Sequence, residues 1–342
     1  MFAYQKAQVS FKFIEEIGQE GQNSKVYRAH DEYLDTEIVI KEVEKKFGFP
    51  VNEYFSEART LYKSAHPHVV QVCYACEDAD KIYVASPFYK NGSLKKMIAG
   101  RFLTTREIIR YSVHILNGVH NVHSKGLIHF DIKPDNVLLS DRNEALLADF
   151  GLTRVVDADG VAKQSTLYVK HLPPEVFGRV EFDNRFDIYQ VGLTIYRMCI
   201  GDSNFDAQFA MYKTGAELGT DIIAGKFPNR KGYPLHIPAK LQKIVNKCLK
   251  TAPGDRYGSA IEVVNALSDI DGLILDWQFT PDKDGMTWEQ CSDGILRTMR
   301  VTNARNATAY TKNGAAEPRR IKPFCKDGIA DEEILSFLND GK

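Results

Sequence analysis

The segment His129-Phe-Asp-Ile-Lys-Pro-Asp-Asn136 decides how the rest of this chain is interpreted. Apolar residues lie on both sides of it, Leu127-Ile128 before and Val137-Leu138-Leu139 after. This pattern is typical of a polar turn between two short buried strands. Because Pro134 cannot donate a backbone hydrogen bond, one continuous strand through the segment is disfavoured.

The turn presents Asp131, Lys133 and Asn136 together. A carboxylate can take a proton from an attacking hydroxyl, an ammonium group can neutralise a phosphoryl group, and an amide oxygen can hold a metal ion. Phosphoryl transfer uses all three, since its catalysis is mostly positioning and charge stabilisation. The alternative is a solvated turn rich in Asp and Asn, which most such segments are. Motifs elsewhere in the chain favour the catalytic interpretation.

Length and composition indicate an ordinary globular protein of roughly two domains. The chain has 342 residues, 44% hydrophobic and 26% charged, and a formal net charge of −1. This charge provides no basic field that would attract nucleic acid or an acidic membrane surface. Residues 1–11 lack the apolar core of a secretory signal, and no apolar run is long enough to span a bilayer. We therefore expect a cytoplasmic protein.

The six cysteines are scattered along the chain. Only Cys73 and Cys76 form a C-x-x-C pair, and no second pair lies at metal-site spacing. Structural burial in a strand is favoured over a redox or zinc role, which remains the alternative.

The first part of the chain is predicted to be rich in strands. Strands are expected at 11–17, 26–29, 37–43, 69–75 and 81–88. A turn with Gly18 and Gly21 separates the first two, and Asn52 can cap a helix that runs to about Ser64. Residues 87–92 read as a connector.

The second part is predicted to be mainly helical. Thr104 and Glu107 have capping-box spacing, and the apolar positions after them indicate a long buried helix. A strand is expected at 145–148 and helices at 188–199, 240–249 and 260–267. From about residue 270 onward, frequent turn signals predict a small strand-rich appendage that ends in a helix at 331–338.

Several further motifs occur in a fixed order around the turn. They are the glycine-containing segment 17–27, Lys41 at the end of an apolar strand, Asp149-Phe-Gly151, Pro173-Pro-Glu175, Asp187 and Arg256. With these motifs the chain from about Phe11 to Leu267 resembles a eukaryotic-type (Hanks-type) protein kinase catalytic domain, serine/threonine-like. Its loop features and size are similar to those of bacterial or phage-encoded members.

The resemblance implies an α+β, two-lobed protein-kinase-like fold. A small strand-rich N-lobe with one helix (11–86), a hinge (87–92) and a larger helical C-lobe (93–270) would form the catalytic domain. Residues 272–342 would form the strand-rich appendage.

The resemblance also implies an ATP site between the lobes. Its residues would be Ile17, Gly18, Gly21, Ser24, Val26, Val39, Lys41, Phe88, Tyr89 and Leu138, with Ser86 as a small gatekeeper. Glycines let backbone N–H groups approach phosphates closely. The match departs from the family at Ser24, which replaces the third glycine, and the loop is one residue longer.

Catalytic roles follow in the same way. Lys41 would bind the α and β phosphates and be oriented by an ion pair with Glu57. Asp131 would be the base for the substrate hydroxyl, and Lys133 would contact the γ-phosphate. Asn136 and Asp149 would hold Mg²⁺ through hard oxygen ligands.

Other matching residues would support the site without doing chemistry. Glu175 would form a buried ion pair with Arg256, and Asp187 would brace the catalytic turn. A column linking the lobes would consist of Leu61, Val72, His129 and Phe150.

One departure concerns activation. Phe130 replaces the arginine that usually precedes the catalytic aspartate and commonly pairs with a phosphorylated activation segment. We therefore expect activity without that pairing, so that alanine at Ser165, Thr166 and Tyr168 leaves most activity.

A second departure concerns the acceptor. Tyr168-Val-Lys-His171 lies where serine/threonine kinases usually place a threonine that touches the catalytic aspartate, and Val-Lys is similar to tyrosine kinases. Lys133 acts on the phosphoryl group directly and favours a serine or threonine hydroxyl of a protein substrate. A tyrosine or dual-specificity kinase, an ATP-binding pseudokinase scaffold and a small-molecule phosphotransferase are the alternatives.

The resemblance does not cover the appendage. Its basic residues include Arg297, Arg300, Lys312, Arg319 and Arg320, with Tyr310 among them. Charges on a solvated sheet face are favoured over nucleic-acid binding. We expect a docking module for a partner or substrate, whose deletion (272–342) would spare activity on a generic substrate.

Overall fold

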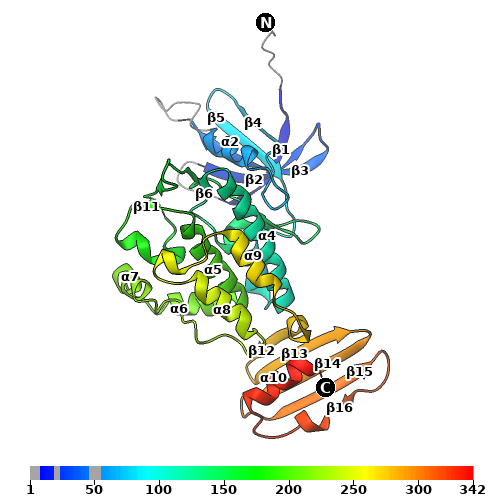
Figure 1. Cartoon of the computed structure of the whole chain (residues 1–342). Coiled ribbons are helices and arrows are strands. Elements are labelled where there is room, and N and C mark those ends of the chain that lie inside the picture. Colours follow the sequence, from blue (N-terminus) through cyan, green and yellow to red (C-terminus); the bar gives the residue numbers. More distant parts are fainter. Residues whose placement is uncertain (1–7, 19–23, 46–54, 166, 342) are drawn as a thin grey trace.

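The computed structural model describes residues 8–18, 24–45, 55–165 and 167–341. Figure 1 shows a strand-rich lobe at the top, a larger helical lobe beneath it, and a further sheet at the C-terminal end. The predicted two-lobed α+β kinase-like fold with a C-terminal strand-rich part is confirmed.

A five-stranded antiparallel sheet forms the N-lobe. Its order is β1 (Phe11–Gly18), β2 (Ser24–Asp31), β3 (Thr36–Glu44), β5 (Lys81–Pro87) and β4 (Tyr74–Glu77). The alternation of β3 determines what each face carries: Ile38 and Ile40 are buried in a small core, whereas Val39 and Lys41 point to the opposite face. Helix α2 (Ser56–Lys63) is the only helix of this lobe among the described residues.

Two boundaries in the N-lobe differ from the prediction. Strand β4 begins at Tyr74, not at Val69, because the backbone before it pairs with the C-lobe: Val70 N donates to Leu147 O (2.9 Å), and Leu147 N donates to His68 O (2.9 Å). Helix α2 begins at Ser56 after Phe55, which makes no side-chain cap. The predicted cap, Asn52, lies outside the described residues.

The burial predicted for the C-x-x-C pair is wrong. Cys73, directly before β4, is exposed and Cys76 in β4 is half-buried, because β4 lies at the edge of the sheet. No cluster of three or more His, Cys, Asp or Glu side chains that could hold a metal ion occurs among the residues described.

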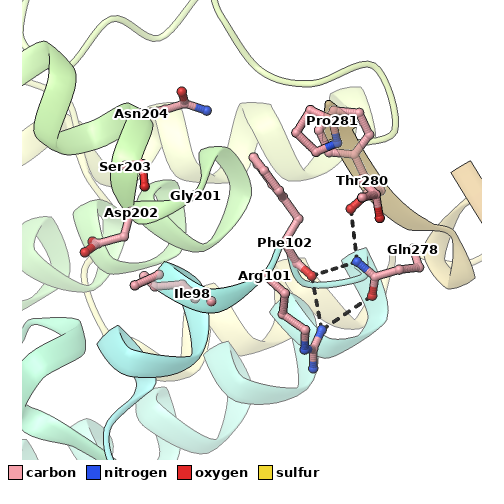
Figure 2. A pocket seen from close by; sticks show the side chains of 13 residues that line it. Ile98, Arg101, Phe102, Gly201, Asp202, Ser203, Asn204, Gln278, Thr280 and Pro281 are labelled. Carbon is pink, nitrogen blue, oxygen red and sulfur yellow. Dashed lines mark hydrogen bonds between the residues drawn. The ribbon is translucent and has the colours of Figure 1, made fainter. Parts of the chain in front are cut away.

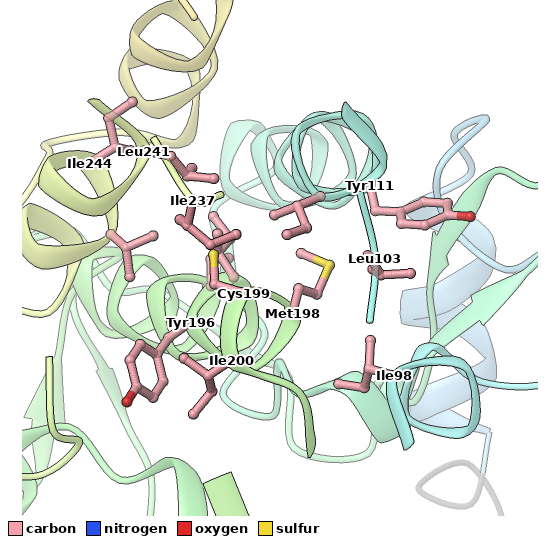
Figure 3. Packing of buried hydrophobic residues seen from close by; sticks show 14 of the residues in the cluster. Ile98, Leu103, Tyr111, Tyr196, Met198, Cys199, Ile200, Ile237, Leu241 and Ile244 are labelled. Carbon is pink, nitrogen blue, oxygen red and sulfur yellow. The ribbon is translucent and has the colours of Figure 1, made fainter. Parts of the chain in front are cut away.

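The C-lobe is built around two central helices. These are α4 (Thr105–Ser124) and α5 (Arg185–Ile200), surrounded by α3 (Leu94–Gly100), α6 (Asp202–Phe209), α7 (Gly215–Ile223), α8 (Ala239–Cys248) and α9 (Ala260–Ser268). The predicted capping box opens α4, since Thr104 Oγ1 accepts from Glu107 N (3.2 Å) and Glu107 Oε2 accepts from Thr104 N (2.9 Å). Figure 3 shows apolar side chains from several of these helices filling the space between them.

Several short strands and 3-10 helices lie between α4 and α9 in the sequence. They are β6 (Leu127–Ile128), η1 (Pro134–Asn136), β7 (Val137–Leu139), β8 (Ala145–Leu147), β9 (Arg154–Val155), β10 (Ala162–Lys163), η2 (Val169–His171), η3 (Pro174–Phe177), β11 (Glu181–Phe182) and η4 (Pro253–Asp255). The pairs β6–β9, β7–β8 and β10–β11 are each antiparallel. The turn expected at 129–136 therefore lies between β6 and β7.

The chain ends in a second five-stranded sheet. After η5 (Leu273–Asp276), strands β12 (Gln278–Asp282), β13 (Gly285–Ser292), β14 (Ile295–Thr302), β15 (Ala307–Asn313) and β16 (Arg319–Arg320) pair in chain order, followed by η6 (Lys322–Phe324) and α10 (Asp331–Asp340). Trp288, Met299 and Val301 from this sheet are buried in one core with Phe337 of α10.

This sheet is anchored on the C-lobe. The Phe279 ring lies 4.9 Å from that of Phe102 and 4.8 Å from that of His236, and Arg106 Nη2 donates to Asp276 Oδ2 (2.9 Å). A cavity of about 400 Å³ lies beside this contact, between α3, the start of α6 and β12. Figure 2 shows the side chains that line it. Trp277 and Phe279 therefore belong to a core that is shared with the helical lobe.

No helix in the described parts of the chain is long and apolar enough to cross a membrane.

Candidate active site

A cleft of about 290 Å³ lies between the two lobes. The predicted residues that line it are Ile17, Val26, Val39, Lys41, Glu57, Leu61, Ser86, Phe88, Tyr89, Asn136, Leu138 and Asp149. Gly18 and Ser24 end β1 and begin β2 outside the lining, and Gly21 lies outside the described residues. Most of the predicted nucleotide site therefore surrounds one space, to which the glycine-containing segment contributes Ile17 and Val26.

Sequence reasoning missed several lining residues. They are Val70, Val84, Gly92, Asp135 and Ala148. Two of them had a detectable signal: Val84 lies two positions before Ser86 on β5 and so shares its face, and Ala148 directly precedes Asp149. Val70 had none, because its place depends on the pairing with Leu147.

Lys41 and Glu57 form the expected ion pair across the N-lobe. Lys41 Nζ on β3 lies 3.0 Å from Glu57 Oε1 and 2.9 Å from Oε2, in the first turn of α2. The side chains keep 22% and 29% of their exposure, so the pair is partly screened from water and still open to the cleft. The pair fixes the orientation of an ammonium group that lines the cleft, where it could bind an anion.

The catalytic turn brings Asp131, Lys133 and Asn136 into direct contact. Lys133 Nζ lies 2.9 and 2.7 Å from the two Asp131 carboxylate oxygens. Asn136 Nδ2 donates to Asp131 O (2.9 Å) and to Asp131 Oδ2 (2.7 Å). Pro134 begins the short helix η1, where its missing N–H costs nothing, and this turn brings Asn136 back toward Asp131.

Asp149 completes the group on the same side of the cleft as Asn136. Its Oδ2 lies 3.4 Å from Asn136 Nδ2, and its Oδ1 accepts from Gly151 N (3.2 Å). A Cβ at Gly151 would lie only 3.2 Å from Asp149 Oδ1 and 3.8 Å from Glu57 Oε2, so glycine keeps this space open. An amide and a carboxylate fit Mg²⁺, which takes few protein ligands and completes its shell with phosphate oxygens and water.

Asp187 of α5 holds the backbone of the catalytic turn. Its two carboxylate oxygens accept from His129 N (2.8 Å) and Phe130 N (2.9 Å), and His123 Nε2 contacts Oδ2 at 2.7 Å. Burial alone would raise the pKa of Asp187, but the His123 contact and the backbone N–H groups lower it below its ordinary value. Asp187 therefore stays ionised, and these hydrogen bonds are charge-assisted.

Phe130 has a left-handed backbone, with φ of 68°. Such a conformation is unfavourable for a residue with a Cβ and persists only where the surroundings enforce it. The side chain is fully buried, 4.8 Å from the Phe186 ring and 6.0 Å from the Phe182 ring. An aromatic cluster thus occupies the place where the arginine was expected from the family pattern.

The expected supporting contacts are also present. Arg256 donates to both oxygens of Glu175 (2.7 and 2.6 Å), with side-chain exposures of 0% and 6%. The Phe150 ring packs on His129 at 4.8 Å, and Leu61 lies in the same core while Val72 packs against it. These contacts join segments that are far apart in the sequence.

Fold and site together define a protein kinase. The chain belongs to the protein kinase family: the family's sequence model, described as the protein kinase domain, matches residues 11–267. The predicted membership of the Hanks-type family is thereby confirmed.

The relatives are mostly serine/threonine kinases. The chain is 26% identical over 279 residues to a probable serine/threonine-protein kinase of Clostridium acetobutylicum, covering 79% of this chain and 41% of that protein. It is 26% identical over 247 residues to the serine/threonine-protein kinase PknL of Mycobacterium tuberculosis, covering 70% of this chain and 61% of PknL. It is 29% identical over 199 residues to ribosomal protein S6 kinase 2 alpha of Xenopus laevis, covering 58% and 26%. The chain thus matches less than two thirds of each.

Proposed function

We propose that this chain is an ATP- and Mg²⁺-dependent protein kinase that transfers the γ-phosphate to a serine or threonine hydroxyl of a protein. The main support for the proposal is that two sets of charged and polar side chains face each other across one cleft. The Lys41–Glu57 pair lies on the N-lobe wall, and Asn136 and Asp149 lie on the opposite wall beside Asp131 and Lys133.

Each group then has a distinct task. Mg²⁺-ATP would supply the phosphoryl group, and Asn136 and Asp149 would hold the Mg²⁺, whose charge would neutralise the phosphates. Lys41 holds the phosphates with its ammonium group oriented by Glu57. Asp131 orients the acceptor hydroxyl and takes its proton, and Lys133 stabilises the charge that develops on the transferred group.

Replacing Lys41 with methionine should lower kcat/KM for phosphoryl transfer by about a hundredfold, since a preorganised charge at the phosphates is lost. Radiolabel transfer from ATP to a generic protein measures this. Lys81→Met is a matched control, because Lys81 pairs with Glu42 at 2.8 Å on the same sheet but outside the cleft. Equal losses in the two variants would argue against a role of Lys41 in catalysis.

Two further measurements test which hydroxyl accepts the phosphate and whether the chain is a pseudokinase. The names of the relatives and the position of Lys133 favour serine and threonine over tyrosine. Phosphosite mass spectrometry of the purified chain and a generic substrate should find serine and threonine sites. Binding of Mg²⁺-ATP without any transfer would instead indicate a pseudokinase.

We also infer that the kinase is of the type that lacks the arginine before the catalytic aspartate. The activation segment, residues 152–172, is held by apolar and backbone contacts: Ala162 and Leu167 pack near Phe130, and Gln164 Nε2 donates to Leu152 O (2.8 Å). Phosphate-dependent pairing is not needed for these contacts.

The variant Ser165→Ala/Thr166→Ala/Tyr168→Phe should therefore keep at least about half of the wild-type kcat in the radiolabel assay. Phenylalanine replaces tyrosine here because the Tyr168 ring lies 4.2 Å from Lys133 Nζ, a cation–π contact that alanine would remove. Thr166 lies outside the described residues. Loss of activity on removing these hydroxyls would show that phosphorylation of the segment is required.

For the C-terminal part we propose a division into a catalytic domain (11–270) and a docking module (272–342). Because Trp277 and Phe279 lie in the shared core, we now expect deletion of 272–342 to destabilise the chain. Surface changes are a better test: Arg300, Lys312 and Arg320 lie on strands of this sheet and are not buried. Their replacement by glutamate should weaken capture of a native partner and leave generic activity unchanged; unchanged capture would oppose a docking role.

A further inference from the structure

The catalytic turn is also held from the side of the activation segment. His171, in η2, is fully buried, and its Nδ1 lies 3.0 Å from the carbonyl oxygen of Ile132, the residue between Asp131 and Lys133. Its Nε2 lies 3.0 Å from Nη1 of Arg197 on α5. One imidazole ring thus bridges the catalytic turn and a buried guanidinium group.

These two contacts determine the tautomer of the ring. A guanidinium group can only donate hydrogen bonds, so Nε2 of His171 must accept. The ring proton then lies on Nδ1 and is donated to Ile132 O. The other polar group of Ile132 is bound as well, because its N–H donates to Gln190 Oε1 (2.9 Å). Gln190 Nε2 in turn donates to Phe130 O (3.1 Å).

Arg197 is itself fixed in place. It is 1% exposed, its Nε donates to Asp202 Oδ1 (3.0 Å), and its Nη2 contacts the same oxygen. Asp202 at the start of α6 is 4% exposed, and Nη1 of Arg197 lies 3.9 Å from Asp135 Oδ2. The guanidinium group also lies over the Phe205 ring, 4.8 Å from its centroid.

We propose that His171 is a positioning residue for the catalytic turn: it binds the Ile132 carbonyl as the neutral Nδ1–H tautomer, and the Arg197–Asp202 pair holds it in that form. This inference rests on the proposed kinase function and adds to it a hydrogen bond that positions the catalytic turn. The contact fixes the backbone between Asp131 and Lys133, so that both side chains keep their orientation relative to each other.

The charges around His171 oppose its protonation. They are the guanidinium of Arg197 on α5, the ammonium of Lys133 on the catalytic turn and that of Lys170 on the same short helix, while Asp202 and Asp135 lie beyond Arg197. Burial and, after it, the Arg197 charge hold the pKa of His171 well below its usual range. A proton on Nε2 would place an N–H donor against Arg197 Nη1, and Nε2 could no longer accept a hydrogen bond from Arg197.

The kinetic test compares His171→Phe with His171→Asn. Phenylalanine removes the donor to Ile132 O, so kcat should fall about tenfold or more, with KM for ATP within about twofold. Asparagine keeps an N–H donor near the position of Nδ1 and should restore most of kcat. His236→Phe is the matched control, since His236 is also fully buried but its ring nitrogens have no hydrogen-bond partner among the described residues. An active wild type with unchanged kcat in His171→Phe would overturn the proposal.

The pH profile separates this role from a purely structural one. The variant Arg197→Gln/Asp202→Asn removes the guanidinium that faces His171 and the carboxylate paired with it, so the pKa of His171 rises and the acid limb of kcat should move up by about one pH unit or more. Adding His171→Asn should abolish that shift. An acid limb that stays in place would contradict the role of Arg197.

A measurement that needs no enzymatic activity tests the inference independently of the proposed function. Long-range ¹H–¹⁵N NMR of the histidine side chains, with His171→Asn for assignment, should identify His171 as the Nδ1–H tautomer. An Nε2–H tautomer would overturn the inference even if the chain is an active kinase, and a wild type without activity would overturn the kinase function alone.

Discussion

Replacing Asp131 with asparagine is expected to lower kcat for phosphoryl transfer by about a thousandfold, the middle of the range for loss of a positioned base. The carboxylate is 5% exposed and receives hydrogen bonds from both Lys133 and Asn136. An amide of the same shape cannot take the proton of the acceptor hydroxyl. The amide is also neutral and replaces one of the two acceptor oxygens with an NH2 donor, so the Lys133 ammonium loses its ion pair and its fixed position beside the transferred group.

Binding of Mg²⁺-ATP should survive this change, because Asp131 is not among the residues that line the nucleotide cleft. Radiolabel transfer measures kcat, and thermal shift with Mg²⁺-ATP measures binding. Asp141→Asn is the control, since Asp141 is exposed and pairs with the exposed Lys90 at 3.2 Å. A D131N protein with kcat within about tenfold of wild type would remove the base assignment.

The largest effect on stability is expected for Arg256→Met. The change leaves Glu175 without its bidentate partner in a site where the two side chains are 6% and 0% exposed. Removing one partner of a buried pair costs about 3–5 kcal/mol. At about 2–4 °C per kcal/mol for a domain of this size, Tm should fall by roughly 6–20 °C. Differential scanning calorimetry measures both values.

Two further variants test the cause. The double change Arg256→Met/Glu175→Met removes both charges and should recover a large part of the lost stability. Arg300→Met breaks an exposed pair with Asp282 (2.7 Å) and should cost less than about 1 kcal/mol. If Arg256→Met unfolds no earlier than Arg300→Met, the buried pair does not stabilise the C-lobe.

Much of the fold could be predicted because the decisive signals were local. The apolar run that ends at Lys41 on β3 and the capping box at Thr104 both act within a few residues, and both elements are present. Helices α3, α6 and α7 were not predicted, because their local signals are weak. They are short, α7 contains two glycines, and their stability comes from packing on the core rather than from their own sequence.

Features that depend on distant partners could not be predicted. The start of β4 was misplaced because Val70 pairs with Leu147, and the exposure of Cys73 follows from its place at the sheet edge. The contact of Phe279 with Phe102 ties the appendage to the C-lobe across a long stretch of chain. The bridge from His171 to Arg197 is of the same kind, since neither residue carries a local signal for the other.

The convergence of Lys41, Glu57, Asp131, Asn136 and Asp149 on one nucleotide is the claim on which the rest depends, and a crystal structure with Mg²⁺ and a non-hydrolysable ATP analogue tests it most directly. We expect the metal on Asn136 and Asp149 oxygens at about 2.0–2.1 Å, with Lys41 Nζ in hydrogen-bond contact with the phosphates. A nucleotide bound elsewhere, or one whose metal touches neither Asn136 nor Asp149, would contradict it.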